Sequence, residues 1–133
     1  MRFVIIGSQR TGSNHLVSLL NSHPEIVCYG ELFRNRYDIL KNIPKISENY
    51  SDINYRKSNF ISLLHYLDQL NYCKTWGFKI FPEHSQKIIE NLIQKNKFKI
   101  VLLQRENILA QYSSLKIVKE QKLFFSKYNS MEN

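Results

Sequence analysis

RFVIIGSQRTGSN, residues 2–14, combines three features of a phosphate-binding unit. The first five residues are mostly branched and apolar, as in a strand buried within a parallel sheet. Gly7 and Gly12 follow with four residues between them, and His15–Ser22 then carries leucines at helical spacing. A strand, a glycine-spaced loop and a helix in this order form a concave anion site from backbone N–H groups and the helix N-terminus. The segment therefore predicts an α/β fold with a phosphate-binding loop.

The order of strand and helix occurs twice more along the chain. We expect buried parallel strands at Thr75–Phe81 and Phe98–Leu103, each followed by apolar residues at helical spacing. This alternation predicts a three-layer αβα fold around a parallel sheet, in which ligands bind beyond the carboxyl ends of the strands. Residues 1–133 are expected to form one domain, with a loop-rich lid at residues 34–60 and a frayed tail at residues 120–133.

The composition restricts the classes of protein. The chain of 133 residues is 43% hydrophobic, which suits a packed domain and excludes a disordered chain. The net charge of +8 favours an anionic partner, but the lysines are scattered and no nucleic-acid-binding motif accompanies them, so we expect no nucleic-acid partner. The sequence has no run of the roughly 20 apolar residues that span a membrane and no signal peptide, so a cytoplasmic location is expected. Cys28 and Cys73 lie in apolar surroundings, which predicts buried, reduced thiols.

The loop lacks the lysine of a nucleoside-triphosphate loop. Ser13 follows the second glycine, where G-x-x-x-x-G-K-[ST] places the lysine that reaches the β- and γ-phosphates. The third predicted strand ends in Gln104 and Arg105, where a magnesium-dependent hydrolase commonly has an aspartate. Arg10 in the loop and Arg105 thus place two cations near one sheet edge. This pair favours a nucleotide with two separated phosphates, and no metal ion is expected.

Two longer motifs, RFVIIGSQRTGSNHLVSLLNSHPEIVCYGELF and KIVLLQRENILAQYSSLKIV, cover residues 2–33 and 99–118. They resemble motifs of the sulfotransferases that use 3′-phosphoadenosine 5′-phosphosulfate (PAPS), especially bacterial carbohydrate sulfotransferases of the trehalose and nodulation-factor type. The first is similar to the family's 5′-phosphosulfate loop, helix and following Glu-x-Phe. By this resemblance Arg10 binds the phosphosulfate and Glu31 is the general base. Further main-chain and hydroxyl donors to the phosphosulfate are then Ser8, Thr11, Gly12, Ser13 and Asn14.

The second motif resembles the family's 3′-phosphate site, an arginine at a strand end and a serine on the next helix. Arg105 fits the arginine. Ser113 fits the usual spacing of eight positions and is slightly favoured, while Ser114 fits a variant in which a glutamine, here Gln111, stands three residues before the serine. Between the motifs, TWGFKIFPEH at residues 75–84 resembles the family's central strand with its Gly-x-Lys segment.

The resemblance implies transfer of a sulfuryl group from PAPS to a hydroxyl of a carbohydrate or glycolipid. Such a displacement needs positive charge at the leaving phosphate and a base at the attacking hydroxyl. Burial of Glu31 among aromatic residues is expected to raise its pKa toward neutrality. His15 and His84 remain alternative bases.

Two other functions stay open at this point. A P-loop nucleotide or small-molecule kinase is disfavoured by Ser13 and by Arg105, for the reasons given above. A non-catalytic sulfotransferase-like domain is the second alternative, because family members usually continue well past the second motif and this chain stops at Asn133. We also expect that missing final elements would expose apolar surface and favour a homodimer or another partner.

Overall fold

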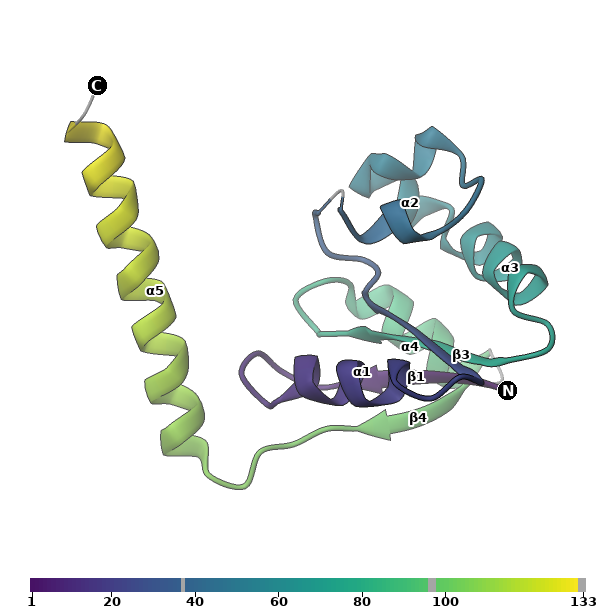
Figure 1. Ribbon diagram of the computed structural model, residues 1–133, viewed down its shortest axis with the longest axis horizontal. Coiled ribbons are helices and arrows are strands. Elements are labelled where there is room, and N and C mark those ends of the chain that lie inside the picture. Colours follow the sequence, from purple (N-terminus) through teal and green to yellow (C-terminus); the bar gives the residue numbers. More distant parts are fainter. Residues whose placement is uncertain (37, 96–97, 132–133) are drawn as a thin grey trace.

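The sheet is the centre of the fold. The computed structural model describes residues 1–36, 38–95 and 98–131, with side chains up to residue 121. Within these residues one sheet contains four parallel strands in the order β2-β3-β1-β4 (Figure 1). The strands are β1 (Arg2–Ile6), β2 (Ile26–Glu31), β3 (Thr75–Ile80) and β4 (Lys99–Leu102).

Helices cover both faces of this sheet and form the expected three layers. Against one face, α1 (Ser13–Asn21) packs Leu16, Val17 and Leu20 onto the strands. Against the other, α3 (Phe60–Leu70) and α4 (Gln86–Gln94) form the larger core with residues of β1 and β3. Trp76, Phe78 and Ile80 of β3 belong to this core and are almost completely buried. The α/β prediction is confirmed.

The connection from β2 to α3 contains more helix than a simple loop. It includes η1 (Asp38–Asn42), η2 (Glu48–Ser51) and α2 (Ile53–Ser58), and it buries Leu40 and Ile43 in the larger core. A loop-rich segment was predicted for residues 34–60, and its role as a lid stays a prediction.

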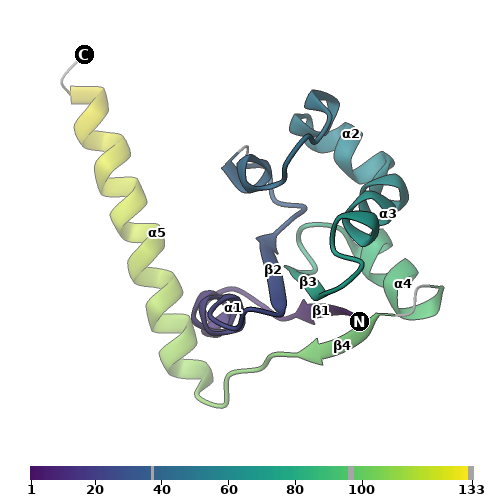
Figure 2. The ribbon, with the colours of Figure 1, turned by 45° about the vertical axis from the view of Figure 1, so that its right-hand side comes forward.

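The third predicted strand forms, but the expectation that it is buried is wrong. Ile100, Val101 and Leu102 of β4 are exposed, because β4 lies at the sheet edge and the next helix does not cover it. That helix, α5 (Ile108–Met131), extends away from the sheet after its first turns (Figures 1 and 2). It includes most of the segment predicted to be a frayed tail; residues 132–133 lie outside the described residues.

The two cysteines differ in burial. Cys28 on β2 is buried and free, as expected. Cys73 is free but exposed, so the expectation of a buried thiol is wrong there. The reason is its position in the turn between α3 and β3, outside the packed layers.

The sequence analysis missed β2, and an irregularity in this strand determines the site. Cys28 of β2 pairs with Gly77 of β3, and Glu31 of β2 pairs with Lys79 of β3. Between these two pairs β2 advances by three residues and β3 by only two, so β2 contains one extra residue. Gly30 accommodates the extra residue with a φ of 72°, in the left-handed region that favours glycine. The bulge therefore places the carboxylate of Glu31 beside Lys79.

Gly77 is required by the close approach of β1, and Gly77→Ala is expected to destabilise the fold. An added Cβ would lie 2.3 Å from the carbonyl oxygen of Phe3 and 2.6 Å from its ring. The two strands must separate, so we expect a loss of about 3 kcal/mol in the free energy of unfolding, measured by urea denaturation. Gly7→Ala is the control, because its Cβ would lie 3.0 Å from the nearest atom and should cost less. Equal stability of both variants would contradict this reading of the strand contact.

Candidate functional site

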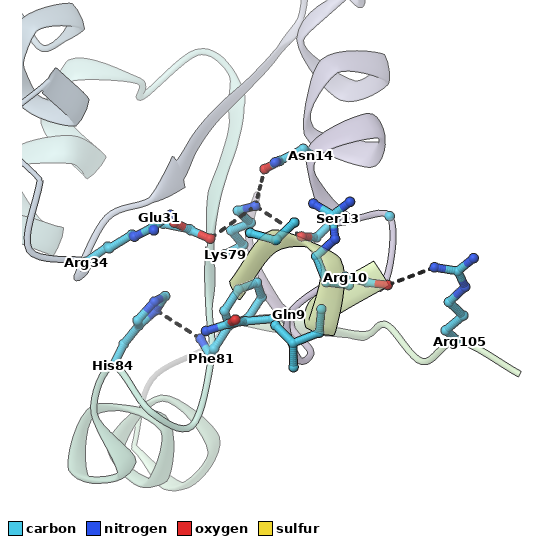
Figure 3. A pocket seen from close by; sticks show the side chains of 13 residues that line it. Gln9, Arg10, Ser13, Asn14, Glu31, Arg34, Lys79, Phe81, His84 and Arg105 are labelled. Carbon is cyan, nitrogen blue, oxygen red and sulfur yellow. Dashed lines mark hydrogen bonds and ion pairs between the residues drawn. The ribbon is translucent and has the colours of Figure 1, made fainter. Parts of the chain in front are cut away.

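An open pocket of about 390 Å³ lies at the carboxyl ends of the central strands (Figure 3). Four parts of the chain form it: the loop after β1 with the start of α1, the end of β2, the end of β3 with the following turn, and α5 with the segment before it. The lining residues are Gln9, Arg10, Gly12, Ser13, Asn14, Glu31, Arg34, Lys79, Phe81, His84, Arg105, Leu115 and Val118.

The loop after β1 has the backbone of an anion cradle. Arg10 and Gly12 both have positive φ angles, 62° and 83°. Gly12 is the N-cap of α1 and supplies no side-chain cap, so the N–H groups of the first helical turn remain available to a ligand in the pocket. Thr11 Oγ1 donates to the carbonyl of Ser8 at 2.8 Å, which closes the loop on itself.

Lys79 brings an ammonium group to the position where the loop lacks a lysine. It comes from β3, is 2% exposed, and donates from Nζ to Ser13 Oγ at 3.0 Å and to Asn14 Oδ1. Ser13 is the residue at the position where a triphosphate loop carries its lysine. The ammonium group therefore reaches the first turn of α1 from the neighbouring strand, 66 residues further along the chain. The available sequence signal was one lysine in the otherwise apolar run TWGFKIF.

Lys79 also joins the loop to the carboxylate of Glu31 (Figure 3). Its Nζ lies 3.5 Å from Glu31 Oε1, and Arg34 donates to Glu31 Oε2 at 2.7 Å. Burial lowers the pKa of Lys79, and the charge and hydrogen bond of Glu31 oppose this. The site thus holds a carboxylate between two cations. From the sequence, Lys79 was noted only as part of a Gly-x-Lys segment, and Arg34 was not assigned to the site.

The expectation that burial raises the pKa of Glu31 is wrong. Burial does act to raise the pKa of this carboxyl, but the hydrogen bond from Arg34 and the charges of Lys79, Arg34 and His84 together outweigh it. The net effect is a pKa below the usual range of glutamate. Glu31 is therefore ionised at neutral pH and is a weaker base than an ordinary glutamate.

His84 lines the pocket, whereas His15 is exposed on α1 and does not line it. His84 Nδ1 accepts from the backbone N–H of Phe81 at 3.1 Å, and the two rings stack with centroids 5.1 Å apart. Burial lowers the pKa of His84, despite the opposing charge of Glu31. A neutral ring that accepts at Nδ1 carries its proton on Nε2, so it can donate but has no free basic nitrogen.

The first turns of α5 are tied to the loop. Gln111 Nε2 donates to Ser8 Oγ at 2.8 Å and to the carbonyl of Gln9 at 2.7 Å. Arg10 Nε donates to Ser114 Oγ at 2.8 Å. Arg105 donates to the carbonyl of Arg10 at 3.2 Å, so both arginines lie at the same rim of the pocket (Figure 3).

These contacts distinguish the two candidate serines. Ser114 lies against the loop arginine, whereas Ser113 is exposed on the same helix. The glutamine three residues before Ser114 makes the accompanying contact with the loop, as in the Gln-containing variant of the motif. Ser114 is thus the serine that contacts the loop, and neither serine is among the residues that line the pocket.

A comparison with known families agrees with this geometry. The model of the sulfotransferase family matches residues 2–126, almost the whole chain. The chain belongs to the sulfotransferase family. No curated protein and no solved structure matches the chain significantly.

The pocket of this sulfotransferase brings together most of the residues that the two motifs indicated. Arg10, Gly12, Ser13, Asn14, Glu31 and Arg105 line it. Ser8 and Thr11 lie in the same loop, where their hydroxyl groups make contacts within the protein. The described residues contain no group of three or more His, Cys, Asp or Glu side chains arranged to hold a metal ion. In the same part of the chain, no helix is long and apolar enough to cross a membrane.

Proposed function

We propose that this sulfotransferase transfers the sulfuryl group of PAPS to an acceptor hydroxyl, with Glu31 as the general base. The observation that carries the proposal is the position of Lys79, which contacts the phosphate-binding turn on one side and the carboxylate of Glu31 on the other. The two requirements of sulfuryl transfer, positive charge and a base, thus lie within one pocket.

The donor side of the pocket suits a nucleotide with two separated phosphates. Arg10, Lys79 and the first turn of α1 would hold the 5′-phosphosulfate. Arg105 and Ser114 would hold the 3′-phosphate, because both lie at the rim where α5 meets the loop. Sulfotransferases generally use PAPS as donor, and the family match favours this nucleotide over the ATP of a kinase.

The reaction follows from these positions. The acceptor oxygen attacks sulfur, its proton passes to the carboxylate of Glu31, and the bond between sulfur and the bridging phosphate oxygen breaks. The products are a sulfate ester and 3′-phosphoadenosine 5′-phosphate (PAP). Lys79 and Arg10 stabilise the negative charge that develops on the departing phosphate oxygen. His84 is suited to donate from Nε2 to an acceptor or sulfuryl oxygen.

We propose a carbohydrate or glycolipid hydroxyl as the acceptor, and here the support is the resemblance of the first motif to bacterial carbohydrate sulfotransferases. Incubation with radiolabelled PAPS and a panel of sugars and glycolipids tests this proposal, with transfer of label to at least one member expected. Transfer only to phenols or amines would contradict the acceptor class. No transfer to any acceptor by a protein that binds PAP would favour the non-catalytic alternative.

PAP is expected to stabilise the folded protein. Binding to the native state alone contributes about 2.7 kcal/mol at a hundredfold excess over Kd, which a thermal melt detects as a higher Tm. Arg105→Ala and Arg10→Ala should each weaken PAP binding by roughly 10- to 100-fold, because each removes charged hydrogen bonds of about 1.5–3 kcal/mol.

Arg36→Ala is the control for these arginine variants. Its guanidinium is exposed and pairs with Asp38 at 2.9 Å, outside the pocket lining. This variant should bind PAP like the wild type. A folded wild-type protein with no change in Tm at millimolar PAP would refute the proposed donor.

A further inference from the structure

Arg56 is a buried cation that the reaction does not use. It lies on α2, is 0% exposed, and donates to four backbone carbonyls. Two of them belong to the turn after β2: Leu32 at 3.0 Å and Arg34 at 2.9 Å. The other two belong to η2: Tyr50 at 2.8 Å and Ser51 at 3.4 Å.

These bonds are specific to the shape of a guanidinium. Burial lowers the pKa of Arg56, and the nearby charge of Asp52 opposes this, but an arginine remains charged under these conditions. A buried charge is costly unless its hydrogen bonds are satisfied, and here carbonyl dipoles from two separate segments satisfy them. Only a planar group with several N–H donors can hold both segments at once.

Arg56 holds the turn from Glu31 to Arg34, and this turn sets the position of the Arg34 side chain relative to the Glu31 carboxylate. Leu32 follows Glu31 directly, and the N–H of Arg34 donates to the carbonyl of Glu31 at 3.1 Å, which closes the turn. The Arg34 side chain then returns to the Glu31 carboxylate at 2.7 Å. A shift of the carbonyls held by Arg56 would therefore move the guanidinium of Arg34 relative to Glu31.

We propose that Arg56 is a positioning residue for the general base, which fixes the turn from Glu31 to Arg34 so that Arg34 pairs with the carboxylate. By the same contacts, η2 and α2 are tied to the turn that follows β2. The effect of Arg56 on catalysis rests on the proposed function. Its effect on the pairing of Arg34 with Glu31 is independent of that function.

The test is a ¹³C NMR titration of the Glu31 carboxyl, with Glu31→Gln used to assign its signal. In Arg56→Lys the charge remains, but one ammonium cannot hold four carbonyls, so Arg34 should move away from Glu31. The pKa of Glu31 should then rise relative to the wild type, because Lys79 of β3 and His84 of the following turn are the remaining groups that lower it. Arg34→Gln should raise the pKa in the same direction.

A double variant separates positioning from a general structural effect. If Arg56 acts through Arg34, Arg56→Lys combined with Arg34→Gln should give the same Glu31 pKa as Arg34→Gln alone. Arg2→Lys is the control: it disturbs an arginine paired with Asp68 at 2.9 Å at the start of β1, away from the pocket. It should lower Tm and leave the Glu31 pKa unchanged.

A second variant covers the case in which Arg56→Lys does not fold. Asp52 Oδ1 accepts from the N–H groups of Asn54 and Tyr55 and so caps α2. Asp52→Ala weakens the helix that carries Arg56, and a smaller rise in the Glu31 pKa is expected. If Arg56→Lys or Asp52→Ala folds and its Glu31 pKa equals that of the wild type, the inference is overturned. It is also overturned if the pKa shifts of Arg56→Lys and Arg34→Gln add up in the double variant. The titration needs neither PAPS nor acceptor, so its failure differs from failure of PAP binding or sulfate transfer.

Discussion

Glu31→Gln is expected to lower the turnover of sulfate transfer by about 10²- to 10⁴-fold, the usual contribution of a general base. The amide is nearly the same size as the carboxylate, and its single oxygen can still accept from Arg34, but its NH2 group then faces Lys79 and it cannot take the hydroxyl proton. PAP binding should stay close to wild type, because the donor is held by the loop and by Arg105. The measurement is kcat with labelled PAPS, alongside PAP affinity by calorimetry.

Glu25→Gln is the matched control for this variant. Glu25 is exposed just before the opposite end of β2, so its loss should leave kcat unchanged. Wild-type turnover in Glu31→Gln would remove Glu31 from the mechanism. The remaining candidate, His84, would then need another arrangement, because its Nδ1 is occupied by the N–H of Phe81.

The lowered pKa of Glu31 also sets the direction of the pH dependence. The base is available above its folded pKa and is lost as the pH falls through that value, so activity should persist into more acidic solution than an ordinary glutamate allows. The stability contributed by the same ion pairs is present above the unfolded pKa and disappears as the pH falls through the folded one. A pH–rate profile and thermal melts across the acid range measure both.

Lys79→Met is expected to lower kcat by about 10²- to 10³-fold, the cost of removing one preorganised charge from a transition state. Methionine is apolar and of similar length, so it fills the space below the loop but cannot bind the departing phosphate oxygen. Arg34 still pairs with Glu31 in this variant, so we expect a folded protein. PAP affinity should fall less than kcat, because Arg10 and Arg105 remain.

The control is Lys74→Met, at an exposed position just before the same strand. Its turnover should equal that of the wild type. A Lys79→Met variant that loses PAP affinity and kcat by equal factors would show that Lys79 only binds the nucleotide. Unchanged kcat would show that the loop does not need a lysine from β3.

The pattern of apolar residues and glycines along the chain predicted several individual strands and helices. It did not predict how these elements pack against one another. The strand, loop and helix within residues 2–21 formed in the predicted order, since a continuous apolar run, glycine conformations and helical spacing of leucines act over neighbouring positions. β2 was missed because six residues with a glycine and a glutamate at the end give a weak strand signal. Burial of β4 was predicted wrongly because its apolar residues do not reveal that the strand lies at an edge.

The choice between Ser113 and Ser114 shows the same limit. Adjacent residues on a helix point about 100° apart, and spacing along the sequence does not determine which of them faces the loop. The contact of Arg10 with Ser114 depends on how α5 lies against residues more than 100 positions earlier. The sign of the Glu31 pKa shift depends likewise on Lys79, from a different strand.

The sequence by itself determined the class of fold and predicted a phosphate-binding loop, because each depends on a short run of neighbouring residues; its resemblance to sulfotransferases indicated Arg10, Glu31 and Arg105 as site residues. Only the tertiary structure decided that Lys79 contacts the first turn after the loop, that Arg34 pairs with Glu31 and that Arg56 holds the carbonyl of Arg34. The physical reason is that these charges interact through space. Their separation is set by the strand order β2-β3-β1-β4 and by the bulge at Gly30, which bring together side chains that lie far apart along the chain.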